Sequence, residues 1–345
     1  MKRILCLLMV FVMIFAVGCK KEEGTETQQP VTEKPATKEI IENVEELTDN
    51  EFIAMANSET RPLAVMIDND GPSSRPQIGL ESAYMVYEVI VEGGASRLMA
   101  LFRTDMIEKV GPVRSSRHYF LDYALEHDAM YLHAGWSPKA TNDISALKVN
   151  NINGIMGDDG TIFYRDNTYD KTWHNLYTKV TDAYKYAKDK KKYRVTSDKK
   201  YTWYSNKEFD LKDGTDALEI EVPYSTMYKV VYKYNPEKKI YERYIGTKPH
   251  TSQTGDILTA KNIIICHVRN YDLADGENKG RQELETVGTG TGYYITNGKA
   301  VEITWNKSGR TAATKYTLKN GKEITINPGN TYVQIVPMDS SVAID

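Results

Sequence analysis

Three arginines are the residues of this sequence best suited to bind a negatively charged group. Arg114 and Arg117 stand three positions apart with Ser115 between them, just before a segment of helical spacing, and Arg97 belongs to the preceding strand-like run. Guanidinium groups bind oxyanions through paired N–H donors, and the free N–H groups at the start of a helix add to such a site. Structural ion pairs with acidic residues of the same strands are the alternative. The spacing alone leaves both interpretations open.

Three acidic residues could supply acid–base or metal-binding chemistry beside these arginines. Glu88 and Glu92 are four positions apart, so that on a strand they face one side, and Asp68 ends another apolar run. Carboxylates brought together can bind a metal or act as general acid and base, but they can equally well pair with the arginines. The sequence has no zinc-cysteine or HExxH pattern, and we predict neither a metal nor a cofactor.

Two histidines are further candidates for a ligand-binding site. His133 ends a strand-like run shortly before Gly135, and His174 is followed by Asn175. A histidine can hold an anion or transfer a proton near neutral pH. A single histidine also commonly has a structural role, and the sequence does not separate the two roles.

These candidates fall in a region where strands alternate with helices. Apolar runs such as 84–91 and 98–102 alternate with stretches of helical spacing such as 176–188, which predicts an α/β layer fold for 51–205. From 206 to 345 the apolar runs are short and separated by Asn-Gly and similar turn signals. We therefore predict an α/β (or α+β) layered N-terminal domain followed by a mostly antiparallel β-rich C-terminal domain.

The N-terminus has the pattern of an exported lipoprotein. Lys2 and Arg3 precede a short apolar run, and Cys19 follows small residues in the way that resembles the lipobox of bacterial lipoproteins. We predict a lipoprotein signal peptide at 1–18, diacylation of Cys19 and a disordered, acidic tether at 19–50. Two acyl chains are enough for stable anchoring. The expected location is the extracytoplasmic face of the cell membrane.

Composition narrows the range of partners. Of 345 residues, 44 are Lys or Arg and 47 are Asp or Glu, and the net charge of -3 argues against a broad basic face for duplex nucleic acid. Three cysteines, one in the predicted signal and one in the lipobox, provide no disulfide framework. We expect membrane lipid as a partner through Cys19, a cell-wall polymer or envelope-assembly protein as another, and no nucleic acid.

Several motifs, in the same order, resemble the YerB-like lipoproteins, a bacterial family with two adjacent domains of unknown function. In the first region they are Arg61-Pro62, Asp68-Asn69, Arg75-Pro76-Gln77, Tyr87-Glu88, Glu92-Gly93-Gly94, Arg97, Gly111-Pro112-Val113-Arg114-Ser115, Arg117, His133-Ala134-Gly135 and His174-Asn175-Leu176-Tyr177. In the second they include Leu258 to Asn262, Gly288 to Gly290, Trp305 and Asn327-Pro328-Gly329. The resemblance implies a lipid-anchored protein of Gram-positive-type bacteria, linked to cell-envelope assembly and without an established reaction.

Two functions are compatible with these observations. The first is binding of an anionic wall component or a protein partner through an Arg-lined cleft. The second is an envelope polymer transferase or hydrolase, by architectural analogy with the LytR–CpsA–Psr phosphotransferases. Convergence of Asp68, Glu88 and Glu92 in one pocket would favour the second function, and pairing of each acid with an arginine would weigh against it.

Overall fold

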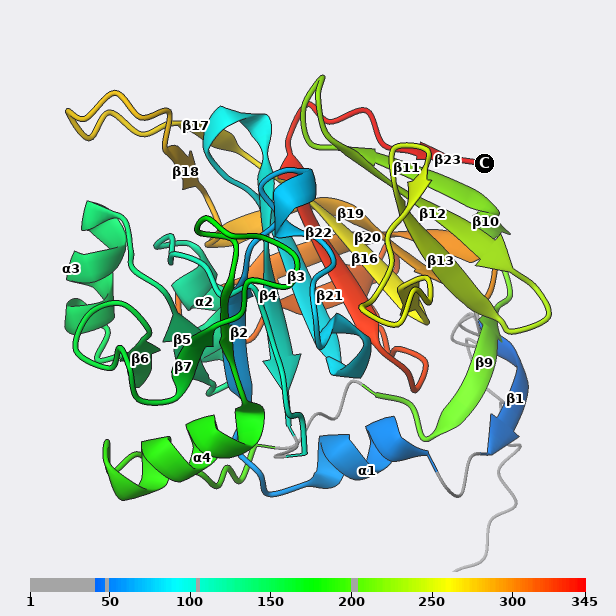
Figure 1. The fold of residues 1–345 in the computed structure, drawn as a ribbon. Helices are drawn as coiled ribbons and strands as arrows, with labels where there is room; N and C mark the ends of the chain where they lie inside the picture. The colour runs from blue at the N-terminus through cyan, green and yellow to red at the C-terminus, as the bar shows by residue number, and fades with distance from the viewer. Residues whose placement is uncertain (1–40, 47–49, 104–105, 200–203) are drawn as a thin grey trace, which may run out of the picture. The chain divides into compact units, whose positions relative to one another are not determined.

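A computed structural model describes residues 50–103, 106–199 and 204–345, together with the backbone of 41–46 (Figure 1). Residues 39–345 form one compact unit. The predicted signal peptide, Cys19 and most of the predicted tether lie outside the described residues. Within the part of the chain that is described, no helix has the length and apolar character needed to cross a membrane.

Most of the described strands belong to two sheets. The larger, 11-stranded sheet has the order β10 (Thr215–Asp216), β20 (Lys299–Lys307), β19 (Gly288–Thr296), β16 (Asn262–Val268), β22 (Thr331–Pro337), β3 (Met85–Ile90), β4 (Ser96–Phe102), β2 (Leu63–Ile67), β5 (Met130–His133) and β6 (Asn151–Asn153), with β21 (Lys315–Leu318) paired to β20. The second, 6-stranded sheet has the order β14 (Lys248–Pro249), β13 (Ile240–Ile245), β12 (Lys229–Asn235), β11 (Glu219–Pro223) and β23 (Ala343–Ile344), with β15 (Thr259–Ala260) paired to β13.

Two-stranded sheets and short helices complete the described fold. The strand pairs are β1 (Ile41–Glu46) with β9 (Lys207–Leu211), β7 (Phe163–Arg165) with β8 (Leu176–Thr178), and β17 (Asn270–Asp272) with β18 (Gln282–Leu284). The α-helices are α1 (Glu51–Asn57), α2 (Phe120–Glu126), α3 (Pro138–Ala146) and α4 (Val180–Asp189), and the 3-10 turns are η1 (Pro72–Ser74), η2 (Leu80–Ser82) and η3 (Glu92–Gly94).

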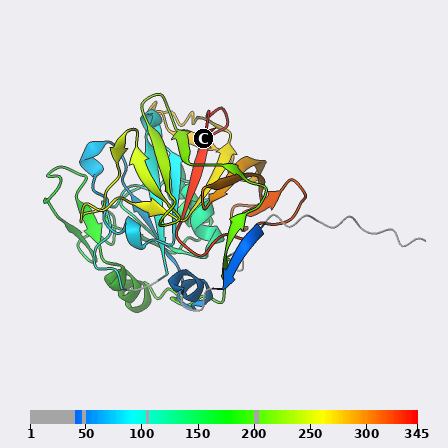
Figure 2. The ribbon, with the colours of Figure 1, turned by 90° about the vertical axis from the view of Figure 1, so that its right-hand side faces the viewer.

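The centre of the main sheet is covered on both faces. Every residue of β3 and β4 is buried, which accounts for their nearly continuous apolar runs. Successive side chains of a strand point to opposite faces, so Tyr87 stacks on Tyr123 of α2, with ring centroids 4.7 Å apart, whereas Glu88 reaches Arg243 of β13. Helix α2 and the second sheet are therefore the layers on either side of β3, and Figure 2 shows the second sheet from its own side.

Strands from both predicted regions join in the main sheet. β22 runs parallel to β3, with Thr331 opposite Met85 and Ile335 opposite Val89. The N-terminal part is a mixed sheet with helices and the C-terminal part is strand-rich and mostly antiparallel, so the predicted fold class is confirmed. The predicted boundary between residues 205 and 206 separates two strand sets of this common sheet, and the division into domains stays a prediction.

Two expectations about local structure are wrong. Residues 41–46, inside the predicted tether, form β1, which pairs with the edge strand β9. A strand edge far along the chain supplies the hydrogen-bond partners, and local composition does not reveal such an edge. The predicted helix 176–188 begins instead with strand β8, and helix α4 starts at Val180. The buried pairing of β8 with β7 outweighs helical spacing there.

A buried polar network joins α2 to β20. The Lys307 ammonium and the Glu126 carboxylate are 2.6 Å apart, and Glu126 also accepts a hydrogen bond of 2.6 Å from the Tyr87 hydroxyl. The His127 ring nitrogen Nε2 lies 2.9 Å from the same hydroxyl, and His127 is 4% exposed. Burial lowers the pKa of His127 to about 3, against the opposing effect of the Glu126 charge. His127 is therefore neutral in the folded protein at neutral pH.

We expect acid to destabilise the fold in part through His127. The unfolded chain binds a proton there near the ordinary pKa of 6.5, whereas the folded chain does so only near pH 3. The neutral His127 makes its full contribution to the free energy of unfolding above pH 6.5. Below that pH the contribution falls by ~1.4 kcal/mol per pH unit. Urea denaturation at pH 7 and pH 5 measures this loss, which His127→Gln should reduce by about 1–2 kcal/mol. An unchanged loss in the variant would contradict this assignment.

Candidate anion-binding site

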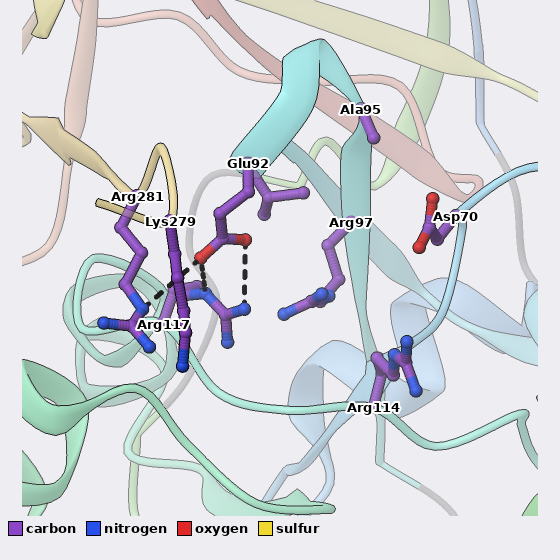
Figure 3. A pocket seen from close by; sticks show the side chains of 9 residues that line it. Asp70, Glu92, Ala95, Arg97, Arg114, Arg117, Lys279 and Arg281 are labelled. Atoms are coloured by element: carbon purple, nitrogen blue, oxygen red, sulfur yellow. Dashed lines mark hydrogen bonds and ion pairs between the residues drawn. The ribbon is translucent and has the colours of Figure 1, made fainter. Parts of the chain in front are cut away.

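The arginine-rich segment and the β3–β4 connection meet at a pocket of about 290 Å³ (Figure 3). Two of its cations come from the chain between β17 and β18, so both halves of the sequence contribute to it. The lining residues are Asp70, Val91, Glu92, Ala95, Arg97, Arg114, Arg117, Lys279 and Arg281. Five positive and two negative side chains make this a cationic surface.

Arg97 is the buried centre of the pocket. It stands near the start of β4, is 5% exposed, and its Nη1 donates a hydrogen bond of 2.7 Å to the backbone oxygen of Ser115. Its Nε is buried and has no hydrogen-bond partner among the described residues, and no described carboxylate lies within 4.0 Å of the guanidinium. Burial, and next the charge of Arg117, lower the pKa of Arg97 to about 10, so it remains charged at neutral pH.

The other cations of the pocket all have carboxylate partners. Arg114 pairs with Asp68, Arg117 with Glu92, Arg281 with Asp275 and Glu277, and Lys279 with Glu277. Within the described chain Arg97 is thus the pocket's one cation without a counter-ion. A buried guanidinium in this state is costly unless an anion joins it.

A tight turn holds Glu92 between the cations. Gly94, in this turn, has φ +73°, and a Cβ there would lie 2.9 Å from the Cβ of Ser225, so the position suits glycine. The Glu92 carboxylate accepts two hydrogen bonds from Arg117, at 2.6 and 3.0 Å, and lies 3.9 Å from Nε of Arg281 (Figure 3). Burial opposes ionisation, but the bonds and charge of Arg117 lower the pKa of Glu92 below its ordinary value.

Asp68 links Arg114 to His174 beside the pocket. The Asp68 carboxylate is fully buried and lies 3.2 Å from Nε of Arg114 and 2.7 Å from Nδ1 of His174. Its other oxygen accepts a hydrogen bond from the backbone N–H of Asp70. The structure therefore brings together three of the residues predicted from sequence. The Asp68 carboxylate holds both the Arg114 guanidinium and the His174 imidazole in place.

The remaining binding candidates do not line the pocket. His133 is fully buried, with its ring nitrogens near the Gly135 carbonyl (2.8 Å) and the Asn151 amide oxygen (3.3 Å), and burial lowers its pKa. Asn175 bonds to Arg165 and Asn167 within the β7–β8 connection. The Ser115 hydroxyl donates to the Ala134 carbonyl, so only its backbone oxygen serves the site, through Arg97.

Glu88 faces away from the pocket and belongs to a separate buried cluster. Its carboxylate pairs with Arg243 at 2.9 Å, and both side chains are fully buried. It also accepts hydrogen bonds from Ser96 (2.6 Å) and Tyr228 (2.7 Å). Both oxygens of the Glu88 carboxylate therefore have partners within the protein, and neither is free to act on a substrate.

Each of the three acid candidates is therefore paired with an arginine, which is the arrangement that weighs against acid–base chemistry. They do not converge in one pocket, and no group of His, Cys, Asp and Glu side chains suited to a metal occurs among the described residues.

Sequence reasoning missed Lys279, Arg281 and Asp70 as lining residues. The first two lie more than 150 positions from Arg117 in sequence, in the connection between β17 and β18. The run Lys279-Gly280-Arg281 in a polar loop was a signal of exposed positive charge, but nothing local placed it against Glu92.

Known proteins are similar to this chain over most of its length. The models of the DUF3048 N-terminal and C-terminal domains, both described as protein of unknown function, match residues 47–194 and 220–333. The putative lipoprotein YerB of Bacillus subtilis (strain 168) is 31% identical over 285 residues, which cover 81% of this chain and 82% of the relative. The crystal structure of YerB from Bacillus subtilis matches with a TM-score of 0.73 and 28% identity, covering 86% of this chain and 97% of that one.

Proposed function

The chain belongs to the DUF3048 family, and from that premise we propose that it is a lipid-anchored protein of the cell envelope that binds a negatively charged group in the pocket around Arg97. A relative named as a lipoprotein supports the anchor predicted at Cys19. The observation that carries the binding proposal is the buried guanidinium of Arg97, whose Nε has no hydrogen-bond partner and which has no carboxylate partner among the described residues. An anionic group of a wall component or a protein partner would supply the missing counter-ion.

The paired acids favour binding over catalysis. A transferase or hydrolase of the alternative kind needs a carboxylate that is free to exchange a proton or hold a metal. Asp68 and Glu92 are held by Arg114 and Arg117 instead. In this proposal these ion pairs fix the geometry of the cationic pocket, and the bound component is not chemically changed.

We expect Arg97→Gln to weaken binding to isolated bacterial cell walls at least about tenfold, since a charge-assisted bond to a buried group contributes on the order of 1.5–3 kcal/mol. The test uses the chain without its predicted signal and lipid, residues 20–345, because the compact unit begins only at residue 39. Binding is measured by co-sedimentation at two salt concentrations.

Arg269→Gln is the matched control. Arg269 is also an arginine, but its side chain is 67% exposed and pairs with Glu285 on the surface. The two variants change the net charge equally, so a general charge effect would affect both. Thermal unfolding of both variants verifies that they are folded, and equal wall binding by the two would overturn the proposal.

A further inference from the structure

We propose that the group bound beside Arg97 is a singly charged phosphodiester. This inference rests on the proposed function and goes further, because it names the chemical class of the bound anion. It follows from the one pocket cation that has no direct counter-ion among the described residues and from the N–H donors that Arg97 and Arg114 leave unused there.

The count of charges favours a monoanion. Within the described chain the exposed Asp70 carboxylate at the rim has no cation partner, and four of the five pocket cations are paired with other carboxylates, so the charge of Arg97 is the one that lacks a direct counter-ion. A monoanion would neutralise this charge. A dianion would add a second negative charge to a partly buried site that already contains Glu92 and the rim carboxylate of Asp70.

The donors favour a tetrahedral group. Nη1 of Arg97 donates to the Ser115 carbonyl, whereas its Nε has no partner within the described part of the chain, so the edge formed by Nε and Nη2 can donate to two oxygens side by side. Arg114 uses Nε for Asp68, and no hydrogen bond within the described chain engages its two terminal nitrogens. The two guanidiniums come from different segments, and in Figure 3 that of Arg97 lies on the side of Glu92 and Arg117 whereas that of Arg114 lies on the side of Asp70.

A planar carboxylate needs only one guanidinium, whose two N–H donors lie in the plane of the carboxylate. The oxygens of a phosphodiester point in tetrahedral directions, so donors from two separate guanidiniums can each reach a different oxygen of the group. The pocket volume of about 290 Å³ is sufficient for a phosphate and the first atoms of its two ester substituents.

Isothermal titration calorimetry of residues 20–345 with small probes tests the charge. The probes are glycerophosphoglycerol (a diester), glycerol 3-phosphate (a monoester), pyrophosphate and acetate. The monoester changes from mainly monoanion to dianion between pH 5 and pH 8, because its second pKa is about 6, whereas the diester keeps one charge. We expect the ratio of monoester Kd to diester Kd to rise about tenfold from pH 5 to pH 8. The diester controls for any change in the protein itself.

Glu92→Gln should reverse this preference as a gain of function. The substitution keeps the size of the side chain but releases the charge of Arg117, so the pocket has two uncompensated positive charges. At pH 8 the monoester-to-diester Kd ratio should fall about tenfold relative to wild type. Glu221→Gln, which removes one carboxylate from the exposed Lys229–Glu221 pair, is the control and should leave the ratio unchanged.

The outcomes separate this inference from the proposed function. Tighter binding of the monoester or pyrophosphate than of the diester to wild type at pH 8 would overturn the single-charge argument. Acetate binding equal to diester binding would overturn the phosphodiester. If no probe binds while cell walls still bind in an Arg97-dependent manner, this inference fails and the proposed function stands. Wall binding that does not depend on Arg97 would defeat both.

Discussion

Replacing Glu88 with glutamine should lower the free energy of unfolding by about 3–5 kcal/mol, because it leaves Arg243 as a buried charge without its partner. Both side chains are fully buried and 2.9 Å apart. The Arg243 guanidinium lies between the rings of Tyr232 and Tyr332, at 5.6 and 5.4 Å, and its Nε and Nη1 have no hydrogen-bond partner among the described residues. Glu88 is therefore the main group that makes this charge tolerable.

Chemical denaturation of single and double variants tests this role. Glu88→Gln combined with Arg243→Met removes both charges and should recover at least half of the loss, because a buried pair replaced by uncharged side chains is often nearly neutral. Glu221→Gln removes a carboxylate from an exposed pair, and we expect it to change stability by less than about 1 kcal/mol. A Glu88→Gln effect as small as that of the control would contradict the assignment.

The Glu88–Arg243 ion pair also links the two segments of the chain that the two family models match. Glu88 lies in the segment matched by the N-terminal model, 47–194, and Arg243 in the segment matched by the C-terminal model, 220–333. The parallel pairing of β22 with β3 connects the same two segments through the backbone. We therefore expect the two segments to unfold together in a single transition.

The part of the site that sequence could predict is the part formed by near neighbours. Arg114 and Arg117 are close in sequence, and the connection between β4 and α2 places both beside the pocket that Arg97 lines from the start of β4. For residues this close in the chain, sequence pattern and residue chemistry are sufficient to predict that they share a site. The fold class was likewise predictable, because alternation of strands and helices and Asn-Gly turns are local signals.

What sequence could not predict depends on long-range pairing. Nothing near Glu88 indicates that its partner is Arg243, 155 positions away, rather than one of the nearby arginines. His133 and Asn175 have the chemistry of ligand-binding residues, but burial and bonds to neighbouring backbone and amide groups use that chemistry within the fold. Residue type shows what a side chain can do, and tertiary contacts decide whether it is free to do it.

The anchor is the remaining large expected effect. We expect Cys19→Ala to move most of the protein from the membrane fraction to the soluble fraction without loss of fold, because Cys19 precedes the compact unit that starts at residue 39. Buried hydrocarbon contributes about 0.8 kcal/mol per CH₂, so two acyl chains account for most of the membrane affinity. The acidic segment 20–50 would not replace them, because an anionic bilayer surface repels it.

Cell fractionation with N-terminal sequencing decides this prediction. An uncleaved signal could still hold the variant through its apolar run, so the released protein must be shown to lack residues 1–18. Thermal unfolding of the released chain should match that of the wild type, since the only cysteine among the described residues, Cys266, is buried and unpaired and no disulfide is lost. Equal membrane retention of a cleaved Cys19→Ala chain would show that another part of the protein binds the membrane. The absence of lipid on wild-type Cys19 would show that the lipoprotein prediction is wrong.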